Sequence, residues 1–446
     1  MRRPFNFAWP AACLLLVALT LYVRREQLSQ LPRPASSFLH PPGEVKAEPS
    51  APTAEVVPTT TASVPSPTHH AVLPQETRTA YVNAIMNPDA ADLPRLQCPK
   101  LDASRYQQLQ ATSKDVPDST IQYFFALDLR QCVALLPRLI GSVVETIRFL
   151  GPKACALSVI EGNSDDGTGE VLAALQPELE ALGVTFYFST TAINPKKGDR
   201  IAALAELRNL AIQPILDNNN ELKYTANDTT IIFLNDVAIC PEDILELVHQ
   251  RVHLGADLVC GMDWTYVGND PTFYDVWIAR ALNGDSFFEI PADGNWNSAW
   301  NLFWNSADTQ ARFAAHQPFQ VFSCWNGGAV FTAAPLLEGE GEEQVRFRTV
   351  REGECAQGEP ELFCKDLWFR GHGKIAVVPT VNLEYSDEAG AKIKEAKGYT
   401  SRWVGGSEWK DEKIEWQAEP PEKVKCMAVY SNQFFEPWNQ SLVPGT

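Results

Sequence analysis

From residue 121 onward, short uninterrupted apolar runs alternate with longer segments in which apolar residues recur at helical spacing. Five runs predict buried strands: 121–129 (IQYFFALDL), 155–162 (CALSVIEG), 184–190 (VTFYFST), 229–237 (TTIIFLNDV) and 256–264 (ADLVCGMDW). The intervening segments predict helices at 134–151, 163–183, 199–216 and 241–253. This order predicts an α/β domain with a mostly parallel sheet and helices on both faces. Ligands bind at the carboxyl ends of such strands, so the polar residues there are candidate site residues.

The chain before residue 81 has a different pattern. Residues 5–23 carry no charge and would span roughly 28 Å as a helix, which predicts a transmembrane signal anchor; a cleaved signal peptide is the alternative. Pro, Ser, Thr and Ala crowd residues 32–74, a composition typical of an extended, disordered stem. The expected order is a cytoplasmic tail (1–4), the anchor (5–23), the stem (24–80) and a luminal domain (81–446) whose core covers about 120–386.

Charge and cysteine content narrow the class of protein. The net charge of -18 and the pI of about 4.9 argue against a nucleic-acid partner, since the phosphate backbone would be repelled. Nine of the ten cysteines follow the anchor without zinc-site spacing, which favours disulfides in the secretory lumen over a metal site. Cys355 and Cys364 could close a local loop, and buried free thiols are the alternative for any of the nine. Asn227 and Asn439 begin glycosylation triplets.

Acidic residues follow the second predicted strand directly. Glu161, Asp165 and Asp166 lie in SVIEGNSDDGTGEV, between that strand and a helix. Carboxylates at such a junction can accept hydrogen bonds from a base or ribose, while the helix N-terminus attracts phosphate. These residues are candidate nucleotide ligands. A capped, Asp-rich turn is the structural alternative.

A single aspartate, Asp236, follows the fourth predicted strand. At that position its carboxylate could bind Mg²⁺ or Mn²⁺ bridging a diphosphate, with water or phosphate completing the shell. Many sugar transferases carry an Asp-x-Asp pattern here, and this chain has only one of the two aspartates. A plain turn aspartate is the alternative.

Basic and aromatic residues supply further candidates. Arg200 and Arg208 are eight residues apart on one predicted helix and could hold a diphosphate, although surface ion pairs would use the same residues. Trp325 and Asn326 precede two glycines that let a sugar approach the backbone. Three more tryptophans recur at four-residue spacing, a pattern more typical of a buried helix face than of a ligand platform: Trp296, Trp300 and Trp304.

A last acidic group surrounds a helix expected to begin near Pro360. Glu359 could orient or deprotonate an acceptor hydroxyl, a role that requires hydrogen-bond contact with that hydroxyl. Asp366 lies on the same helix. His372, between two glycines, is more typical of a structural turn than of a metal ligand.

These segments resemble the fungal capsule-associated mannosyltransferases of glycosyltransferase family 69. The resemblance runs from about residue 121 to 386 and is carried, in order, by SVIEGNSDDGT, LAELRNLAI, FLNDVAICPEDILEL, CGMDW, FYDVW, NGDSFFEIP, FQVFSCWNGGAVF and ELFCKDLWFRGHGKIAVVPTVNLEYS. It implies a GT-A type fold, GDP-mannose as donor, dependence on Mn²⁺ or Mg²⁺, and an α-linked mannose product, of α-1,3 linkage, in capsule or cell-wall glycans. The expected anchor, stem and luminal cysteines predict a type II protein of the Golgi membrane, with other Golgi glycosyltransferases as candidate partners.

Carried over by position, the resemblance assigns Asp236 to the metal and diphosphate, and Glu161, Asp165 and Asp166 to the nucleotide. It places Glu359 and Asp366 near the reacting sugar, with Asp263 of CGMDW as a third catalytic candidate. Retention of the α configuration needs either a carboxylate nucleophile or same-face attack assisted by the leaving phosphate, and the residues do not decide between them.

Other classes remain as alternatives. An inactive glycan-binding or accessory protein could keep this fold without Asp236 and Glu359, and both residues are present. A transferase that uses another nucleotide sugar would carry the same motifs. A membrane-tethered lectin would bind glycan without nucleotide, and the acidic and basic clusters argue against it.

Overall fold

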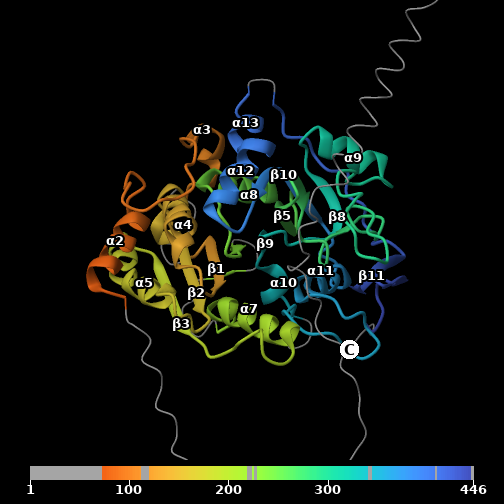
Figure 1. The fold of residues 1–446 in the computed structure, drawn as a ribbon, viewed down its shortest axis with the longest axis horizontal. Helices are drawn as coiled ribbons and strands as arrows, with labels where there is room; N and C mark the ends of the chain where they lie inside the picture. Colours follow the sequence, from red (N-terminus) through yellow and green to blue (C-terminus); the bar gives the residue numbers. More distant parts are fainter. Residues whose placement is uncertain are drawn as a thin grey trace, which may run out of the picture. The chain divides into compact units, whose positions relative to one another are not determined.

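The computed structural model describes residues 73–111, 120–217, 224–225, 229–339, 344–406 and 409–442. Its central sheet has the strand order β3-β2-β1-β4-β9-β5-β10-β8-β7, with β6 paired to β5. Figure 1 labels β1, β2 and β3 at one end of this sheet and β5, β10 and β8 toward the other. The strands are β1 (Tyr123–Leu129), β2 (Cys155–Glu161), β3 (Thr185–Thr190), β4 (Thr230–Leu234), β5 (Leu258–Val267), β6 (Asp270–Phe273), β7 (Arg280–Ala281), β8 (Phe319–Ser323), β9 (Gly328–Thr332) and β10 (Ile375–Leu383).

Most strands of this sheet run in the same direction. Strands β3, β2, β1 and β4 pair in parallel, as do β5 and β10. Strand β9 runs antiparallel to both of its neighbours, β4 and β5, so those two share one direction. Strand β8 is antiparallel to β10. The predicted α/β fold with a mostly parallel sheet is therefore confirmed, and β9 brings one reversed strand into its middle.

Helices cover both faces of the sheet (Figure 1). They are α2 (Gln75–Met86), α3 (Ala103–Tyr106), α4 (Leu136–Leu150), α5 (Thr168–Ala174), α6 (Gln176–Leu182), α7 (Arg200–Leu216), α8 (Pro241–Leu254), α9 (Ala307–Ala314), α10 (Ala334–Leu337), α11 (Glu359–Phe369), α12 (Asp387–Lys397) and α13 (Thr400–Val404). A separate hairpin pairs β11 (Lys423–Val429) with β12 (Asn432–Pro437).

Side chains that alternate along β1 divide the interior into two cores. Phe125 and Leu127 join a cluster with residues of α4, α5 and α8. Phe124 and Ala126 point the other way and join residues of α7 and α11. Because successive side chains of a strand point to opposite faces, a strand covered on both faces needs the continuous apolar run seen in the sequence.

Two predicted elements differ in the structure. The helix expected over 163–183 is two helices, α5 and α6, because Pro177 lacks an N–H and stands in the first turn of α6. The tryptophan spacing does not form a helix: Trp300 is 82% exposed in a run of turns. There, Asp293 accepts from the N–H of Asn295, and Asn295 accepts from the N–H of Asn297. Such side-chain bonds compete with helix formation.

Three disulfides join distant segments of the described chain: Cys98–Cys240, Cys260–Cys324 and Cys355–Cys426. The expected Cys355–Cys364 loop is therefore wrong. Cys364 lies inside α11 and is buried, with its thiol 3.5 Å from the carbonyl of Cys324. Cys132 and Cys155 are also buried free thiols.

The N-terminal predictions fall almost entirely outside the described residues. The anchor at 5–23 and the stem up to residue 72 are not described, and α2 begins at Gln75, before the expected domain start at residue 81. No helix within the described ranges has the length and apolar character needed to cross a membrane.

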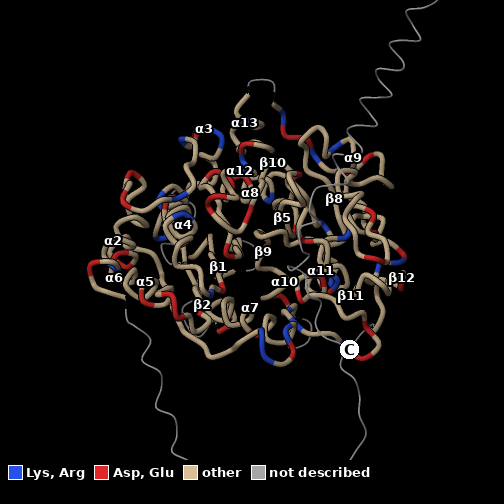
Figure 2. The backbone as a smooth tube through the Cα atoms, viewed as in Figure 1, with Lys and Arg blue, Asp and Glu red and all other residues tan. Residues whose placement is uncertain are grey.

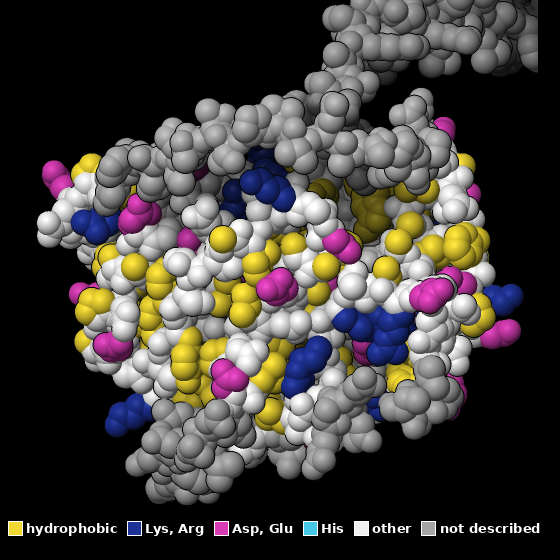
Figure 3. Space-filling view, turned by 90° about the horizontal axis from the view of Figure 1, so that it is seen from below, with side chains coloured by type: hydrophobic (Ala, Val, Ile, Leu, Met, Phe, Trp, Pro, Cys, Tyr) yellow, Lys and Arg dark blue, Asp and Glu magenta, His cyan; other side chains and the backbone are white. Residues whose placement is uncertain are grey.

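Charged residues are mixed over the described fold. Figure 2 shows acidic and basic positions close together around α11, the helix that carries Glu359, Lys365 and Asp366. On the face seen in Figure 3, acidic and basic side chains are interspersed with apolar ones.

Candidate active site

Two carboxylates stand at the carboxyl ends of neighbouring strands. Asp128 is the penultimate residue of β1, and Asp236 follows β4 after Asn235. Burial raises the pKa of Asp128 to about 6, with attraction from Arg208 acting against it. Burial also raises the pKa of Asp236. The charge of Asp236 contributes to the raised pKa of Asp128, so the two carboxylates lie near each other where β1 and β4 end.

Neither carboxylate accepts a hydrogen bond from another residue in the described part of the chain. The backbone N–H of each residue acts on its own carboxylate and lowers the pKa of that group. Partly buried carboxylates without donors lose solvation that a partner would restore. The pair therefore has free oxygen ligands to offer.

Arg208 of α7 is the buried cation of this site. Its Nε donates to Glu359 Oε1 at 2.9 Å, and its Nη1 lies 3.5 Å from Asn235 Oδ1. Its guanidinium lies 4.6 Å from the ring centroid of Trp325. Burial lowers the pKa of Arg208, but attraction to Asp128 and Glu359 outweighs burial and raises it overall. Arg208 therefore remains charged and balances the surrounding carboxylates.

A second acidic pair lies deeper. Asp263 of β5 is fully buried; its Oδ2 accepts from the hydroxyl of Tyr385 at 2.7 Å, while Oδ1 has no partner among the described residues. Asp275 follows β6 and accepts from the backbone N–H of Asn326 at 3.0 Å. Burial and then repulsion from Asp275 raise the pKa of Asp263, and burial raises that of Asp275 to about 6. Such a pair favours holding one proton between its two carboxyls.

The turn before β9 joins these groups. Asn326 and Gly327 both have positive φ, 52° and 78°, which favours Asn and Gly. A Cβ on Gly327 would lie 3.0 Å from a methyl group of Val237. In this turn, Asn235 donates its backbone N–H to the Gly327 carbonyl at 3.0 Å, and Trp325 Nε1 donates to Asn235 Oδ1 at 3.0 Å. The turn thus fixes the end of β4 against the start of β9.

The structure places Trp325 and Asn326 beneath the site. Trp325 is 1% exposed and packs under Arg208 among aromatic rings, so it supports the cation and does not present its ring face to solvent. Asn326 is also buried, and its amide donates to the Gly261 carbonyl at 2.8 Å. Both residues belong to the scaffold that holds Asn235 and Asp275 in position.

The predicted nucleotide ligands form the turn after β2. The carboxylate of Glu161 accepts from the N–H groups of Asn163 and Ser164, at 3.1 and 2.6 Å. Asp166 accepts from the N–H groups of Val133 and Thr168, both at 3.0 Å. These bonds fasten the turn to the segment after β1. The charges of Asp166, Glu161 and Asp236 all act on Cys132, so the turn borders the Asp236 side of the site.

The third of these ligands, Asp165, is exposed and accepts from Gln131 Nε2 at 2.6 Å.

Arg200 and its neighbours border the site on another side. Arg200 is the exposed first residue of α7, and its charge acts on Tyr274. The ring of Tyr274 packs edge-on against that of Tyr385, with centroids 5.3 Å apart. Tyr274 is 47% exposed, so this aromatic pair leads from the buried Asp263 to the surface beside a basic residue.

The residues predicted on α11 separate into two groups. Glu359, in the first turn, is buried against Arg208. Asp366, about 10 Å further along the helix, accepts from Arg348 with both oxygens, at 2.6 and 2.8 Å. Arg348 also holds Glu354. The structure therefore brings Glu359, and not Asp366, to the carboxylates at the strand ends.

Two further residues of that acidic region lie apart from the strand-end carboxylates. His372 lies 3.5 Å from a carboxylate oxygen of Asp257. Glu361 lies 3.6 Å from Arg280, and burial raises its pKa to about 8.

Sequence reasoning missed four residues of the site: Asp128, Asn235, Asp275 and Tyr385. Asp128 had a readable signal, since a lone carboxylate interrupts the apolar run of β1 at its end. Asp275 and Tyr385 follow less regular segments, and only the folded sheet brings them to Asp263.

Comparison with known proteins gives matches of three kinds. Residues 122–366 match the family model described as Cryptococcal mannosyltransferase 1. The protein named Alpha-1,3-mannosyltransferase CMT1, from Cryptococcus neoformans var. neoformans serotype D, is 37% identical over 319 residues, covering 68% of this chain and 67% of that protein.

Among solved structures, residues 1–349 of S. aureus TarS match at 11% identity with a TM-score of 0.34, over 65% of this chain and 67% of that one. The mannosyltransferase PcManGT from Pyrobaculum calidifontis, in complex with GDP-Man and Mn²⁺, matches at 9% identity with a TM-score of 0.33, over 70% and 67%. Both are distant structural neighbours.

Proposed function

Because the chain belongs to the cryptococcal mannosyltransferase family, we propose that it transfers mannose from GDP-mannose to a mannoside acceptor, forming an α-1,3 linkage. The enzyme class follows from family membership; the donor, the acceptor and the linkage are the proposal. The observation that carries it is the arrangement at the ends of β1 and β4, where Asp128 and Asp236 lie without donors from other described residues beside the buried Arg208.

The carboxylates at the strand ends fit a divalent cation. Mg²⁺ and Mn²⁺ prefer oxygen ligands and are typically held by one or two carboxylates together with substrate phosphates. Asp236 and Asp128 offer such oxygens, and no side chain competes for them in the described chain. When bound, the cation would neutralise charge that develops on the leaving diphosphate.

Arg208 and Glu359 act together as a buried ion pair. Glu359 fixes the guanidinium of Arg208 by a 2.9 Å ion pair, and Trp325 supports it from below. A preoriented cation stabilises negative charge that develops during reaction without having to reorganise. Glu359 is therefore a positioning residue for Arg208, while Arg208 stabilises the diphosphate side of the reaction.

Asp263 and Asp275 are suited to bind a hydroxyl group of the donor or acceptor sugar. Because burial and mutual repulsion hold one proton on the pair, it can both accept and donate hydrogen bonds at neutral pH. The free Oδ1 of Asp263 is one such acceptor in the described part of the chain. We assign the pair to a sugar hydroxyl of donor or acceptor, with Tyr385 orienting Asp263.

The exposed edge of the site suits the nucleotide. Arg200 and Asp165 are both exposed, at the start of α7 and in the turn after β2. Arg200 can pair with phosphate, and carboxylates of the turn can accept from ribose or base. We propose that GDP lies across the ends of β1 and β2 in a GT-A type domain.

The location is also a proposal. Three disulfides in the described chain favour folding in an oxidising compartment, and Asn439 of the Asn-Gln-Ser triplet is exposed. Together with the apolar segment at 5–23, this supports a type II Golgi protein with its catalytic domain in the lumen.

Calorimetric titration of the purified full-length chain tests the donor and the cation. We expect GDP-mannose to bind with Mn²⁺ at least ~10-fold more tightly than UDP-N-acetylglucosamine, and Asp236→Asn to abolish the gain that Mn²⁺ gives. The exposed Asp92→Asn is the matched control and should bind as the wild type does. Preference for the UDP sugar, or an unchanged Mn²⁺ effect in Asp236→Asn, would refute the proposal.

A further inference from the structure

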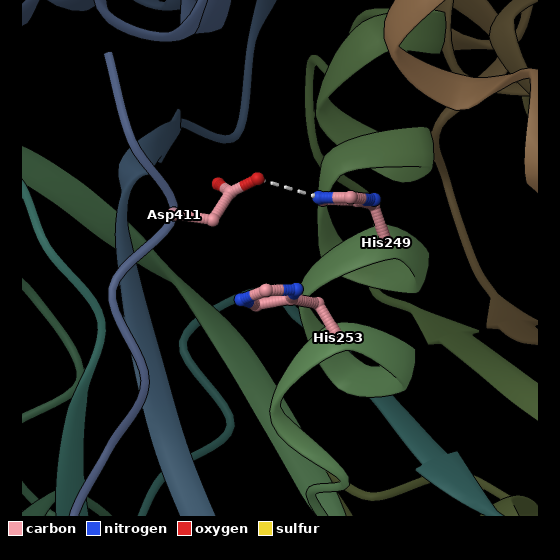
Figure 4. Close-up of side chains that lie close together, drawn as sticks. All are labelled: His249, His253 and Asp411. Atoms are coloured by element: carbon pink, nitrogen blue, oxygen red, sulfur yellow. Dashed lines mark hydrogen bonds and ion pairs between the residues drawn. The ribbon is translucent and has the colours of Figure 1, made fainter.

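Two histidines on the last turns of α8 lie beside an aspartate of the C-terminal segment. His249 and His253 are four residues apart on this helix, so their side chains lie on one face. Their rings are stacked with centroids 5.7 Å apart, and Asp411 of the C-terminal segment lies opposite them (Figure 4). One ligand atom from each of the three residues lies within 4.8 Å of the others. Three such groups placed this close could converge on one metal ion.

The carboxylate of Asp411 is held in a fixed orientation. Its Oδ1 accepts from Arg105 at 2.6 Å, from Gln250 at 2.9 Å and from Trp409 at 3.1 Å. Its Oδ2 also accepts from Arg105, at 3.1 Å, and lies 3.0 Å from His249 Nε2. Donors around a ligating carboxylate are the usual outer shell of a metal site, since they fix its orientation.

The histidines carry the second observation. His253 Nε2 is buried and has no hydrogen-bond partner in the described part of the chain. A buried polar atom left without a partner is costly, and a metal ion would satisfy this one. The other ring nitrogen of His249, Nδ1, lies 2.8 Å from the side-chain amide nitrogen of Gln108. Ligation through Nε2 requires a proton on Nδ1, and the Gln108 amide would accept from that N–H in its other orientation, with the oxygen toward the ring.

The local charge permits a cation. Arg105 lies next to Asp411, but it also pairs with Glu246 through Nε and Nη2, at 2.8 and 2.9 Å. Glu246 is fully buried, so this pair is strongly shielded from solvent. The charge of Arg105 is thus balanced by Glu246, and the carboxylate of Asp411 keeps a negative charge for a metal ion.

The cluster is remote from the carboxylates at the strand ends. α8 begins at Pro241, five residues after Asp236, and His253 lies about 18 Å further along the helix axis. The helix then turns at Gly255 into the start of β5. The cluster therefore lies at the amino end of β5, and the site of transfer lies at the carboxyl ends of the strands.

The C-terminal segment 409–417 crosses this end of α8. Trp416 donates to the Leu254 carbonyl at 3.3 Å, and the ammonium of Lys413 contacts the His253 carbonyl. Gln417 pairs through its backbone with the side chain of Gln320 on β8. A metal held by His249, His253 and Asp411 would add a strong link between α8 and this segment.

We propose that His249, His253 and Asp411 bind one Zn²⁺, with water as the fourth ligand, and that the ion fastens segment 409–417 to α8. Two imidazoles and one carboxylate suit zinc, whereas the all-oxygen carboxylates at the strand ends suit Mn²⁺ or Mg²⁺. The zinc site does not depend on the proposed transfer reaction.

Zinc titration of the metal-stripped full-length chain, by calorimetry and by the visible absorption of bound Co²⁺, tests the site. We expect one Zn²⁺ per chain, and at least ~10-fold weaker binding in His253→Gln and in His249→Gln. His372→Gln, which changes a histidine beside a single carboxylate, should bind zinc as the wild type does. Asp236→Asn should also be unchanged, which separates this site from the catalytic cation.

Two controls test whether the zinc is held by these three residues and whether it orders the segment. His69 and His70 are adjacent in the sequence, so the double variant His69→Gln, His70→Gln must keep the zinc affinity. Zinc should slow proteolysis within 409–417 in the wild type but not in His253→Gln, with circular dichroism confirming that both are folded. Binding that survives in both single variants, or that is lost in the His69, His70 double variant, would overturn the proposal.

Discussion

Arg208 shows how single residues organise the site. Its guanidinium is buried against Glu359 and the ring of Trp325, and the charge of Asp128 also acts on it. Such a cation is costly to bury, but its removal leaves carboxylates uncompensated in a medium of low polarity. The charge balance at the strand ends therefore depends on one side chain from α7.

Arg208→Ala should lower the free energy of unfolding by about 3–5 kcal/mol, because it leaves Glu359 and Asp128 buried without their cation. Urea unfolding followed by circular dichroism measures this. Lys392→Ala is the control, since it breaks an exposed ion pair with Glu388 on α12 and should leave the midpoint unchanged. Equal losses of unfolding free energy in the two variants would contradict the expectation that burial makes the Arg208 ion pair costly to break.

The raised pKa of Asp128 predicts how the free energy of unfolding changes with pH. Burial raises its pKa from the ordinary 3.8 to about 6, so between these values the folded state binds more protons than the unfolded state. Its contribution to stability is therefore complete below the ordinary pKa of 3.8 and is lost as the pH rises through about 6.

Asp128→Asn should remove this contribution, so its stability relative to wild type should rise between about pH 4 and about pH 7. Urea midpoints of both proteins in metal-free buffer, taken at intervals of about one pH unit across that range, measure the difference. Parallel curves for the two proteins would contradict the assignment. Asp275 titrates similarly in both proteins, so it cancels in the comparison.

At the residue scale, part of the candidate site could be read from the sequence. Asp236 was readable because it directly follows an apolar strand, and the strand's existence fixed the edge of the sheet at which it lies. Asp275 could not be recognised from the sequence, because it follows a short edge strand and reaches Asp263 only through the pairing of β5 with β6. The sequence suggested that Glu359 orients or deprotonates an acceptor hydroxyl. The structure shows its carboxylate in a buried ion pair with Arg208.

Among the elements, β9 has the strongest influence on the site. It enters antiparallel between β4 and β5, and the turn before it carries Asn326 and Gly327 into contact with Asn235 and Asp275. The regular strands β1 to β5 were predicted from their apolar runs. The antiparallel direction of β9 was not predicted, because strand direction depends on pairing partners that are far apart in the sequence.

Gly327→Ala should destabilise the protein and reduce transfer, because the turn needs φ of 78° and the new Cβ would lie 3.0 Å from Val237. Gly371→Ala is a matched control, since Gly371 has φ of 83° and open space around its Cβ position. Both should lose about 1 kcal/mol for the left-handed conformation, and only Gly327→Ala should lose more. Thermal unfolding and a transfer assay on both variants measure this; equal losses would exclude steric contact at the turn.

At the scale of the whole molecule, disulfides connect segments that the sheet alone does not. Cys98–Cys240 joins the segment after α2 to the N-terminus of α8, and Cys355–Cys426 joins the segment before α11 to β11. Cysteine count alone favoured an oxidising compartment, but it could not give the pairing, which depends on the positions of segments distant in sequence.

Alkylation of the unfolded but unreduced protein tests this pairing. Peptides that contain Cys132, Cys155 and Cys364 should be labelled, and those with Cys98, Cys240, Cys260, Cys324, Cys355 and Cys426 should not. Mass spectrometry before and after reduction provides the readout. Labelling of Cys426 without reduction would contradict the Cys355–Cys426 bond.

The central claim is that carboxylates at the ends of β1 and β4 support mannose transfer, and radiolabelled GDP-mannose tests it most directly. The purified full-length chain is incubated with an α-mannobiose acceptor, with Mn²⁺ or with chelator, beside Asp236→Asn and the control Asp92→Asn. We predict Mn²⁺-dependent transfer by wild type and Asp92→Asn, and a loss of at least ~100-fold in folded Asp236→Asn. Undiminished transfer by Asp236→Asn would contradict the account.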